Sequence, residues 1–126
     1  MVDIEDAVFR AVRQAVTAVY STAYVSGEYV KAPPSFPAVS IVEMENAVYE
    51  GAQTLSSIEN MARLVYEVNF FSNQKNGKKS ECKAIAALVD AKMESMGFRR
   101  TMLNPIQNME DATIYRMVGR YQKLHS

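Results

Sequence analysis

The chain has 126 residues, with 14 basic and 14 acidic side chains and a single cysteine, Cys82. This length predicts one domain, residues 1–126, that buries a core without disulfide staples. The balanced charge argues against a dedicated duplex-binding domain, because such domains need a basic excess. One cysteine excludes an intramolecular disulfide and a cysteine-based zinc site, and it favours a reducing cytosolic setting. No apolar run approaches about 18 residues, so we expect no membrane span.

The first predicted element is an amphipathic helix over residues 3–20. Asp3 is the expected N-cap, and the acidic residues after it suit the positive end of the helix dipole. Apolar residues recur on one face at near-helical spacing. They are Ile4, Val8, Val12, Ala15 and Val19. This pattern is typical of a helix packed on a sheet.

Two long connections and two strands are expected next. Residues 24–35 are broken by Gly27 and by prolines, and they form a connection that leaves room for a short strand. Residues 38–46 predict a strand that is apolar on both faces. Residues 46–62 lack a clean periodicity and are expected to form a long hairpin connection. Residues 63–72 alternate, with Leu64, Tyr66, Val68 and Phe70 on one face.

A second helix is expected to follow a polar turn at residues 73–79. Asn76-Gly77 suits positive φ, Ser80 is the expected cap, and Gly97 is the expected C′ residue. The predicted buried stripe comprises Cys82, Ile85, Val89, Met93 and Met96.

Two closing strands are expected over residues 98–105 and 113–124, separated by a turn. The order is therefore helix, strands, helix, two strands. Because amphipathic helices need an apolar surface to cover, we predict an α+β domain with a mostly antiparallel sheet of about four to five strands and two helices packed on it.

The sequence provides little that could support catalysis. His125, the single histidine, lies one residue from the end of the sequence, and Cys82 falls on the inner stripe of a helix. A general base needs a fixed position, so neither residue is expected to be catalytic. Glu43 and Glu45 are two apart on a strand and are expected to share a face. We predict no enzyme activity and no catalytic, cofactor-binding or metal-binding residues.

The loop around residues 73–81 carries Lys75, Asn76, Lys78 and Lys79 at the start of a helix. Free amide groups at a helix N-terminus attract anions, but the loop lacks the glycine spacing of a P-loop. A solvated turn and a contact with an acidic protein surface are both open interpretations. Specific nucleic-acid binding is the weaker alternative.

Three stretches together resemble the tail terminator (tail completion) proteins of long-tailed bacteriophages. They are "FPAVSIVEMEN", "YEVNFFSNQKNGKKSECKAIAALVDAKMESMGFRR" and "TIYRMVGRY". The likeness covers roughly residues 36–121 and depends on the order and spacing of its motifs. Its key positions are Phe36-Pro37, Glu45-Asn46, the strand Tyr66 to Asn73, Gly97-Phe98-Arg99-Arg100, Ile114-Tyr115-Arg116 and Arg120-Tyr121.

This resemblance implies a structural assembly protein of the virion tail at the head–tail junction, made in the bacterial host cytoplasm. Such proteins form a homo-hexameric ring on the head-proximal end of the tail tube, stop polymerisation of the major tail tube protein and present a surface to head and neck connector proteins. The role needs no cofactor and no membrane, and DNA can pass through the ring lumen without specific binding.

The resemblance also suggests where contacts lie. We expect the 46–62 connection and its edges to reach a neighbouring subunit or the tube, through Glu45, Asn46, Tyr49, Glu50 and Gln53. We expect the lysine loop to face an acidic ring or the lumen, through Lys75, Asn76, Lys78 and Lys79. Two alternatives stay open: another neck, head-closure or tail tube protein, and a small nucleic-acid-binding α+β domain.

Overall fold

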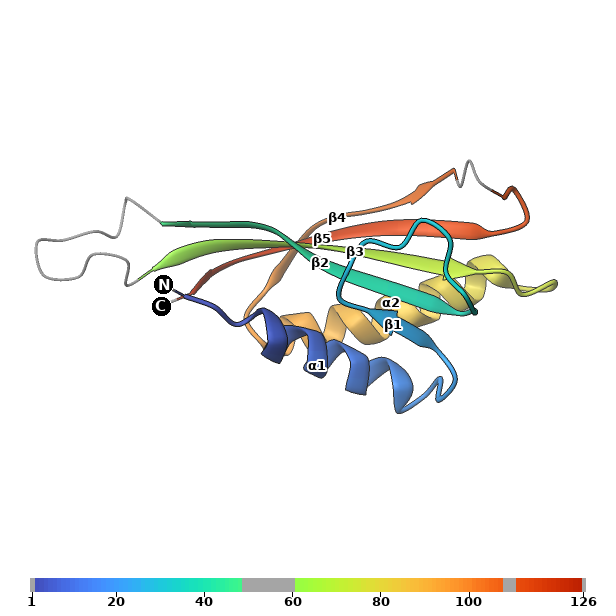
Figure 1. The fold of residues 1–126 in the computed structure, drawn as a ribbon, viewed down its shortest axis with the longest axis horizontal. Coiled ribbons are helices and arrows are strands. Elements are labelled where there is room, and N and C mark those ends of the chain that lie inside the picture. Colours follow the sequence, from blue (N-terminus) through green and yellow to red (C-terminus); the bar gives the residue numbers. More distant parts are fainter. Residues whose placement is uncertain (1, 49–60, 108–110, 126) are drawn as a thin grey trace, which may run out of the picture.

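The computed structural model describes residues 2–48, 61–107 and 111–125. It has two helices and one five-stranded sheet, which confirms the α+β class and the expected order of elements. Both helices lie on the same face of the sheet (Figure 1). The elements are α1 (Glu5–Thr17), β1 (Tyr24–Ser26), β2 (Ala38–Val48), β3 (Ala62–Ser72), α2 (Lys78–Ser95), β4 (Arg99–Ile106) and β5 (Tyr115–His125).

The strands lie in the order β1-β2-β3-β5-β4. β1 runs parallel to β2, and the other three pairings are antiparallel, so the sheet is mostly antiparallel as predicted. β1 pairs only with the first three residues of β2, from Ala38 to Ser40. Of the expected connections, 24–35 therefore contains a short strand. The expected connection at 46–62 is shorter than predicted at both ends, because residues 46–48 belong to β2 and Ala62 belongs to β3. Residues 49–60 lie outside the described residues.

The core fills the space between the helices and the inner face of the sheet, meaning the face that the helices cover. Leu64, Tyr66, Val68 and Phe70 alternate along β3 and are all buried, which confirms the expected face. The Tyr66 ring meets Phe98 edge-on, with centroids 5.4 Å apart. Because β3 is the middle strand and both neighbours are long, its side chains are shielded from water on both sides.

Helix α1 is shorter than the predicted helix. It ends at Thr17, so Val19 lies past its end and is 62% exposed, and the predicted buried position there was wrong. The buried positions are Val8, Val12 and Val16, which are four residues apart and therefore share a face. At the start, the Glu5 amide donates to Asp3 Oδ1 at 3.3 Å, although Ile4 holds the N-cap position assigned to Asp3.

Helix α2 begins at Lys78, two residues before the predicted cap at Ser80. Gly77 takes the N-cap position with φ of +91°, and its carbonyl accepts the Glu81 amide at 2.8 Å. Glycine adopts positive φ without the steric cost of a side chain. The helix therefore begins directly after Gly77, before the predicted cap at Ser80. The predicted buried stripe is otherwise correct, with Met96 partly buried at its end.

The C-terminal end of α2 forms a Schellman motif, with Gly97 at the predicted C′ position. The Phe98 amide donates to Met93 O at 3.0 Å and the Gly97 amide donates to Glu94 O at 2.9 Å. Gly97 has φ of +88°, which a side chain resists. This motif reverses the chain from α2 into β4.

We expect Gly97→Ala to lower the free energy of unfolding by about 1 kcal/mol, because alanine is strained at positive φ. Gly97→Asn should fall between glycine and alanine, since asparagine tolerates this region better. Urea denaturation of the two variants and the unmodified protein measures the order. Equal stability of the Gly97→Ala variant and the unmodified protein would contradict the assigned backbone conformation.

Candidate interaction surfaces

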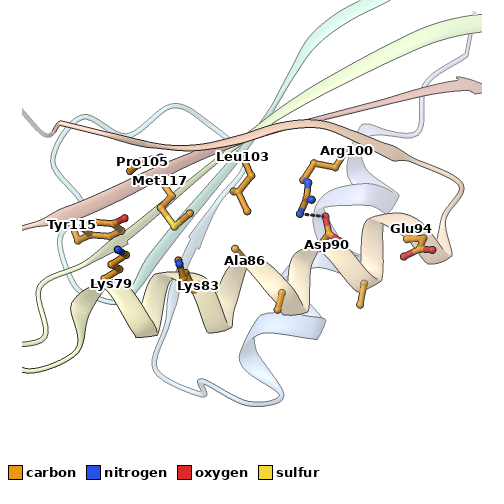
Figure 2. Close-up of a pocket in the computed structure, with 12 residues that line it drawn as sticks. Lys79, Lys83, Ala86, Asp90, Glu94, Arg100, Leu103, Pro105, Tyr115 and Met117 are labelled. Atoms are coloured by element: carbon orange, nitrogen blue, oxygen red, sulfur yellow. Dashed lines mark hydrogen bonds and ion pairs between the residues drawn. The ribbon is translucent and has the colours of Figure 1, made fainter.

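A groove runs between α2 and the edge strand β4 on the inner face (Figure 2). Its volume is about 570 Å³. The helix contributes small side chains, including the buried Ala86, and the strands contribute Leu103 and Met117. Because alanine side chains are short, they leave space between the helix and the sheet, and Leu103 and Met117 make the floor of this space apolar.

Charged side chains occupy the two ends of this groove. Lys79 and Lys83 lie near the start of α2, beside Tyr115. Asp90 and Glu94 lie toward its end, where Arg100 Nη1 approaches Asp90 Oδ1 at 3.4 Å. The groove therefore has positive charge at one end and mixed charge at the other, a polarity suited to orienting a protein segment.

The structure separates the residues of the lysine loop. Lys75 and Asn76 are exposed on the turn before α2. Lys78 Nζ donates to Thr113 O at 3.1 Å, so it fastens the turn to the segment entering β5. Lys79 lines the groove instead. The four residues thus have different settings: two lie on the exposed turn, one bonds to Thr113 and one lines the groove.

At the other end of the molecule, Glu45 and Asn46 lie on the second half of β2. Glu45 pairs with Arg63, with Oε2 and Nε 2.9 Å apart. Asn46 Nδ2 donates to Val2 O at 2.7 Å and holds the N-terminal segment near the strand. The other predicted contact residues at this end, Tyr49, Glu50 and Gln53, lie outside the described residues.

Glu43 and Glu45 do not share a face, and that expectation was wrong. The register with β3 shifts between them, because Glu43 lies opposite Tyr66 and Glu45 lies opposite Val65. Met44 is therefore the extra residue of a β-bulge, which turns Glu43 to the inner face and Glu45 to the outer face. A bulge leaves no reliable signal in the alternation of side chains, so the sequence did not reveal it.

Glu43 belongs to an acidic hollow of about 410 Å³, which also includes Asp3 and Glu5. Tyr66 Oη donates to Glu43 Oε1 at 3.0 Å. Burial raises the pKa of Glu43, and the charges of Glu5 and Asp3 add to this increase, against the lowering effect of the Tyr66 hydrogen bond. The residues that line the hollow include neither lysine nor arginine. Three acidic side chains therefore gather here without a basic neighbour in the lining.

The outer face of the sheet carries a polar ladder across β3 and β5 that the sequence analysis missed. Arg116 donates from Nε and Nη2 to Asn69 Oδ1, at 3.0 and 2.7 Å, and its guanidinium lies 5.5 Å from the centre of the Phe71 ring. Asn69 and Phe71 are both buried. Arg120 pairs with Glu67 at 3.0 Å. The alternation of polar and basic residues on the two strands was the available signal, but only their pairing brings them together.

Cys82 lies in the core, and its thiol donates to Tyr115 O at 3.5 Å. Burial, and to a lesser extent the charge of Glu81, raises the pKa of this thiol to about 12. The thiol is therefore protonated and unreactive at neutral pH. We expect iodoacetamide at pH 8 to modify Cys82 only after urea unfolds the protein. Rapid labelling of the native protein, detected by mass spectrometry, would contradict its buried position.

Other candidate chemistry is sparse in the described part of the chain. His125 lies at the end of β5, opposite Ala62, rather than on a free chain end. No group of three histidine, cysteine, aspartate or glutamate side chains in this part is arranged to hold a metal ion. Neither of the two described helices has the length and apolar character needed to cross a bilayer.

The fold matches a known structure across nearly its whole length. A chain in the structure of the virion of a native gene transfer agent (GTA) particle superimposes with a TM-score of 0.65. The match covers 96% of this chain and 92% of that chain, at 15% sequence identity. At such low identity the likeness establishes a shared α+β fold. No protein-family model and no curated protein sequence matches the chain.

Proposed function

We propose that this chain is a structural protein of a phage-type virion, and that it acts as a tail terminator. In this role, six copies form a ring on the head-proximal end of the tail tube, stop addition of the tube protein and provide the surface for head and neck proteins. The chain would work by shape and contact, without catalysis. The observation that carries the proposal is the nearly full-length match to a chain of a GTA virion particle.

The positions of the tail-terminator motifs support this proposal. The motif residues of "YEVNFFSN" form most of the central strand β3, and those of "IYR" and "RY" fall on or beside its partner β5. "GF" forms the Schellman turn that begins β4. The motifs therefore trace one continuous part of the fold, from β2 through β4, rather than scattered surface positions.

The surfaces also suit an assembly protein. An open groove with polar ends, an acidic hollow and exposed apolar side chains on β2 occur on one small chain. Exposed apolar residues next to charged ones are typical of protein contact surfaces. The balanced charge of 14 basic and 14 acidic residues adds little repulsion between copies.

The direct test is to measure tail tubes with and without the protein. Tails from the source phage lacking this protein should have tubes of uncontrolled length that do not join heads. Adding the purified protein to tubes should halt their growth and place density at one tip in electron micrographs. Density along the whole tube would instead identify a tube subunit, and binding to isolated necks alone would identify a head-closure adaptor. Either result would overturn the proposal, as would specific single-stranded DNA binding without tube capping.

A further inference from the structure

Two strand edges of the sheet lack a backbone partner in the described part of the chain. β1 pairs with β2 only as far as Ser40, so residues 41–48 have an open side. β4 forms the opposite edge of the sheet over its eight residues. The N-terminal segment meets the open part of β2 through the side chain of Asn46. Unpaired strand edges are templates for pairing with another chain.

The directions of the strands allow the sheet to continue from copy to copy. β2, β3, β5 and β4 follow one another with antiparallel pairing at each step, so β4 runs opposite to β2. A neighbouring copy in the same orientation would place its β4 antiparallel to the open part of β2. Contacts of this head-to-tail kind generate closed rings when the rotation between copies is right.

The two edges carry opposite charge. The open part of β2 contains Glu43 and Glu45 and no basic residue, and Glu43 is joined by Asp3 and Glu5 in the acidic hollow. β4 begins with Arg99 and Arg100 and contains no acidic residue. Arg99 is exposed, and the ion pairs found among the described residues do not include it.

One register matches these charges on both faces. Glu43 faces the helices, as does Arg100, which reaches Asp90 of α2. Glu45 faces the outer side, and Arg99, next along β4, falls on the opposite face from Arg100 because strand side chains alternate. Pairing Glu43 with Arg100 and Glu45 with Arg99 therefore satisfies both faces together.

The irregularities of the two strands fit the same register. β2 has an extra residue between Glu43 and Glu45, and β4 has one between Arg100 and Met102. With both extra residues skipped, Val42 meets Met102 on the outer face. With Met44 and Thr101 skipped, the side chains of each strand alternate between the two faces, so the paired residues share a face on both sides of each bulge. Pro105, which has no backbone N–H to donate, lies beyond this overlap, opposite the part of β2 that β1 already covers.

We propose that residues 41–45 of β2 in one copy pair antiparallel with residues 99–103 of β4 in a second copy, with Glu43 against Arg100 and Glu45 against Arg99. Closure of this contact into a ring rests on the proposed tail-terminator function, but the pairing itself can be tested without a tail tube. The interface combines backbone hydrogen bonds with two pairs of oppositely charged side chains, which fix its register.

Cross-linking tests the register directly. Mixed at high concentration under mild oxidation, a Val42→Cys protein and a Met102→Cys protein should form a covalent heterodimer, because directly opposed Cβ atoms lie about 4.5–5.5 Å apart. The control partner is Ile106→Cys, on the same strand but four residues farther along, and it should not cross-link with Val42→Cys. Equal cross-linking of both pairs, or of neither, would overturn the proposed register.

A charge reversal tests the energetics. Arg99→Glu should raise the dissociation constant for self-association at least tenfold in sedimentation analysis, since it places like charge against Glu45 of the neighbour. The control is Arg13→Glu, an equal change of charge at an exposed residue of α1 outside both strand edges, and it should have little effect. Intact tube capping with no effect of Arg99→Glu and no cross-link would reject the edge pairing and leave the tail-terminator function standing. Specific cross-linking without tube capping would support the edge pairing and reject the tail-terminator function.

Discussion

Replacing Tyr66 with alanine is expected to lower the free energy of unfolding by about 3–5 kcal/mol. Tyr66 is 1% exposed on the central strand, and its ring packs edge-on against Phe98. Truncation leaves a cavity between the sheet and α2. It also removes the hydroxyl that donates a hydrogen bond to Glu43. Urea denaturation monitored by circular dichroism measures the loss.

Tyr66→Phe separates the ring from the hydroxyl. It keeps the packing and removes the hydrogen bond to Glu43, which is worth about 1 kcal/mol. Burial, with the Glu43 carboxylate as the next cause, raises the pKa of the Tyr66 hydroxyl far above its ordinary value, so it is a donor at any physiological pH. If phenylalanine proved as damaging as alanine, the hydroxyl rather than the packing would be the main contribution.

Replacing residues 49–61 with Asn-Gly is expected to abolish ring formation while leaving the monomer folded. Val48 and Ala62 are directly paired, so a two-residue turn can join them. The shorter loop should leave stability unchanged or raise it by up to about 1.5 kcal/mol, because closing it costs less entropy. The variant removes the predicted contact residues Tyr49, Glu50 and Gln53 but keeps Glu45 and Asn46.

Light scattering in the presence of tube tips reports the ring, and thermal unfolding reports the fold. A triple alanine variant at Tyr49, Glu50 and Gln53 is the matched test of side chains alone. Cross-linking between Val42→Cys and Met102→Cys should persist in the shortened protein, since both strands remain. Rings as abundant as those of the unmodified protein would reject a contact role for the 49–61 connection.

Much of the local structure followed from residue order. Alternation along residues 63–72 is produced by a strand with one face in the core, and Gly97 followed by Phe98 forms the expected helix end. These signals depend on nearest neighbours in the chain, which is why the α+β class and the order of elements were predicted correctly. The errors at Val19 and Ser80 concern the ends of helices, where a glycine or a short turn decides the boundary.

The sequence by itself determined the class of fold, the buried faces of β3 and α2 and most of that of α1. Only the tertiary structure decided which polar residues come together. The bulge at Met44 separates Glu43 from Glu45, and the β3–β5 pairing brings Arg116 to Asn69 across 47 positions in sequence. The physical reason is that periodicity records which face of an element is buried, whereas contacts between elements depend on strand order and register.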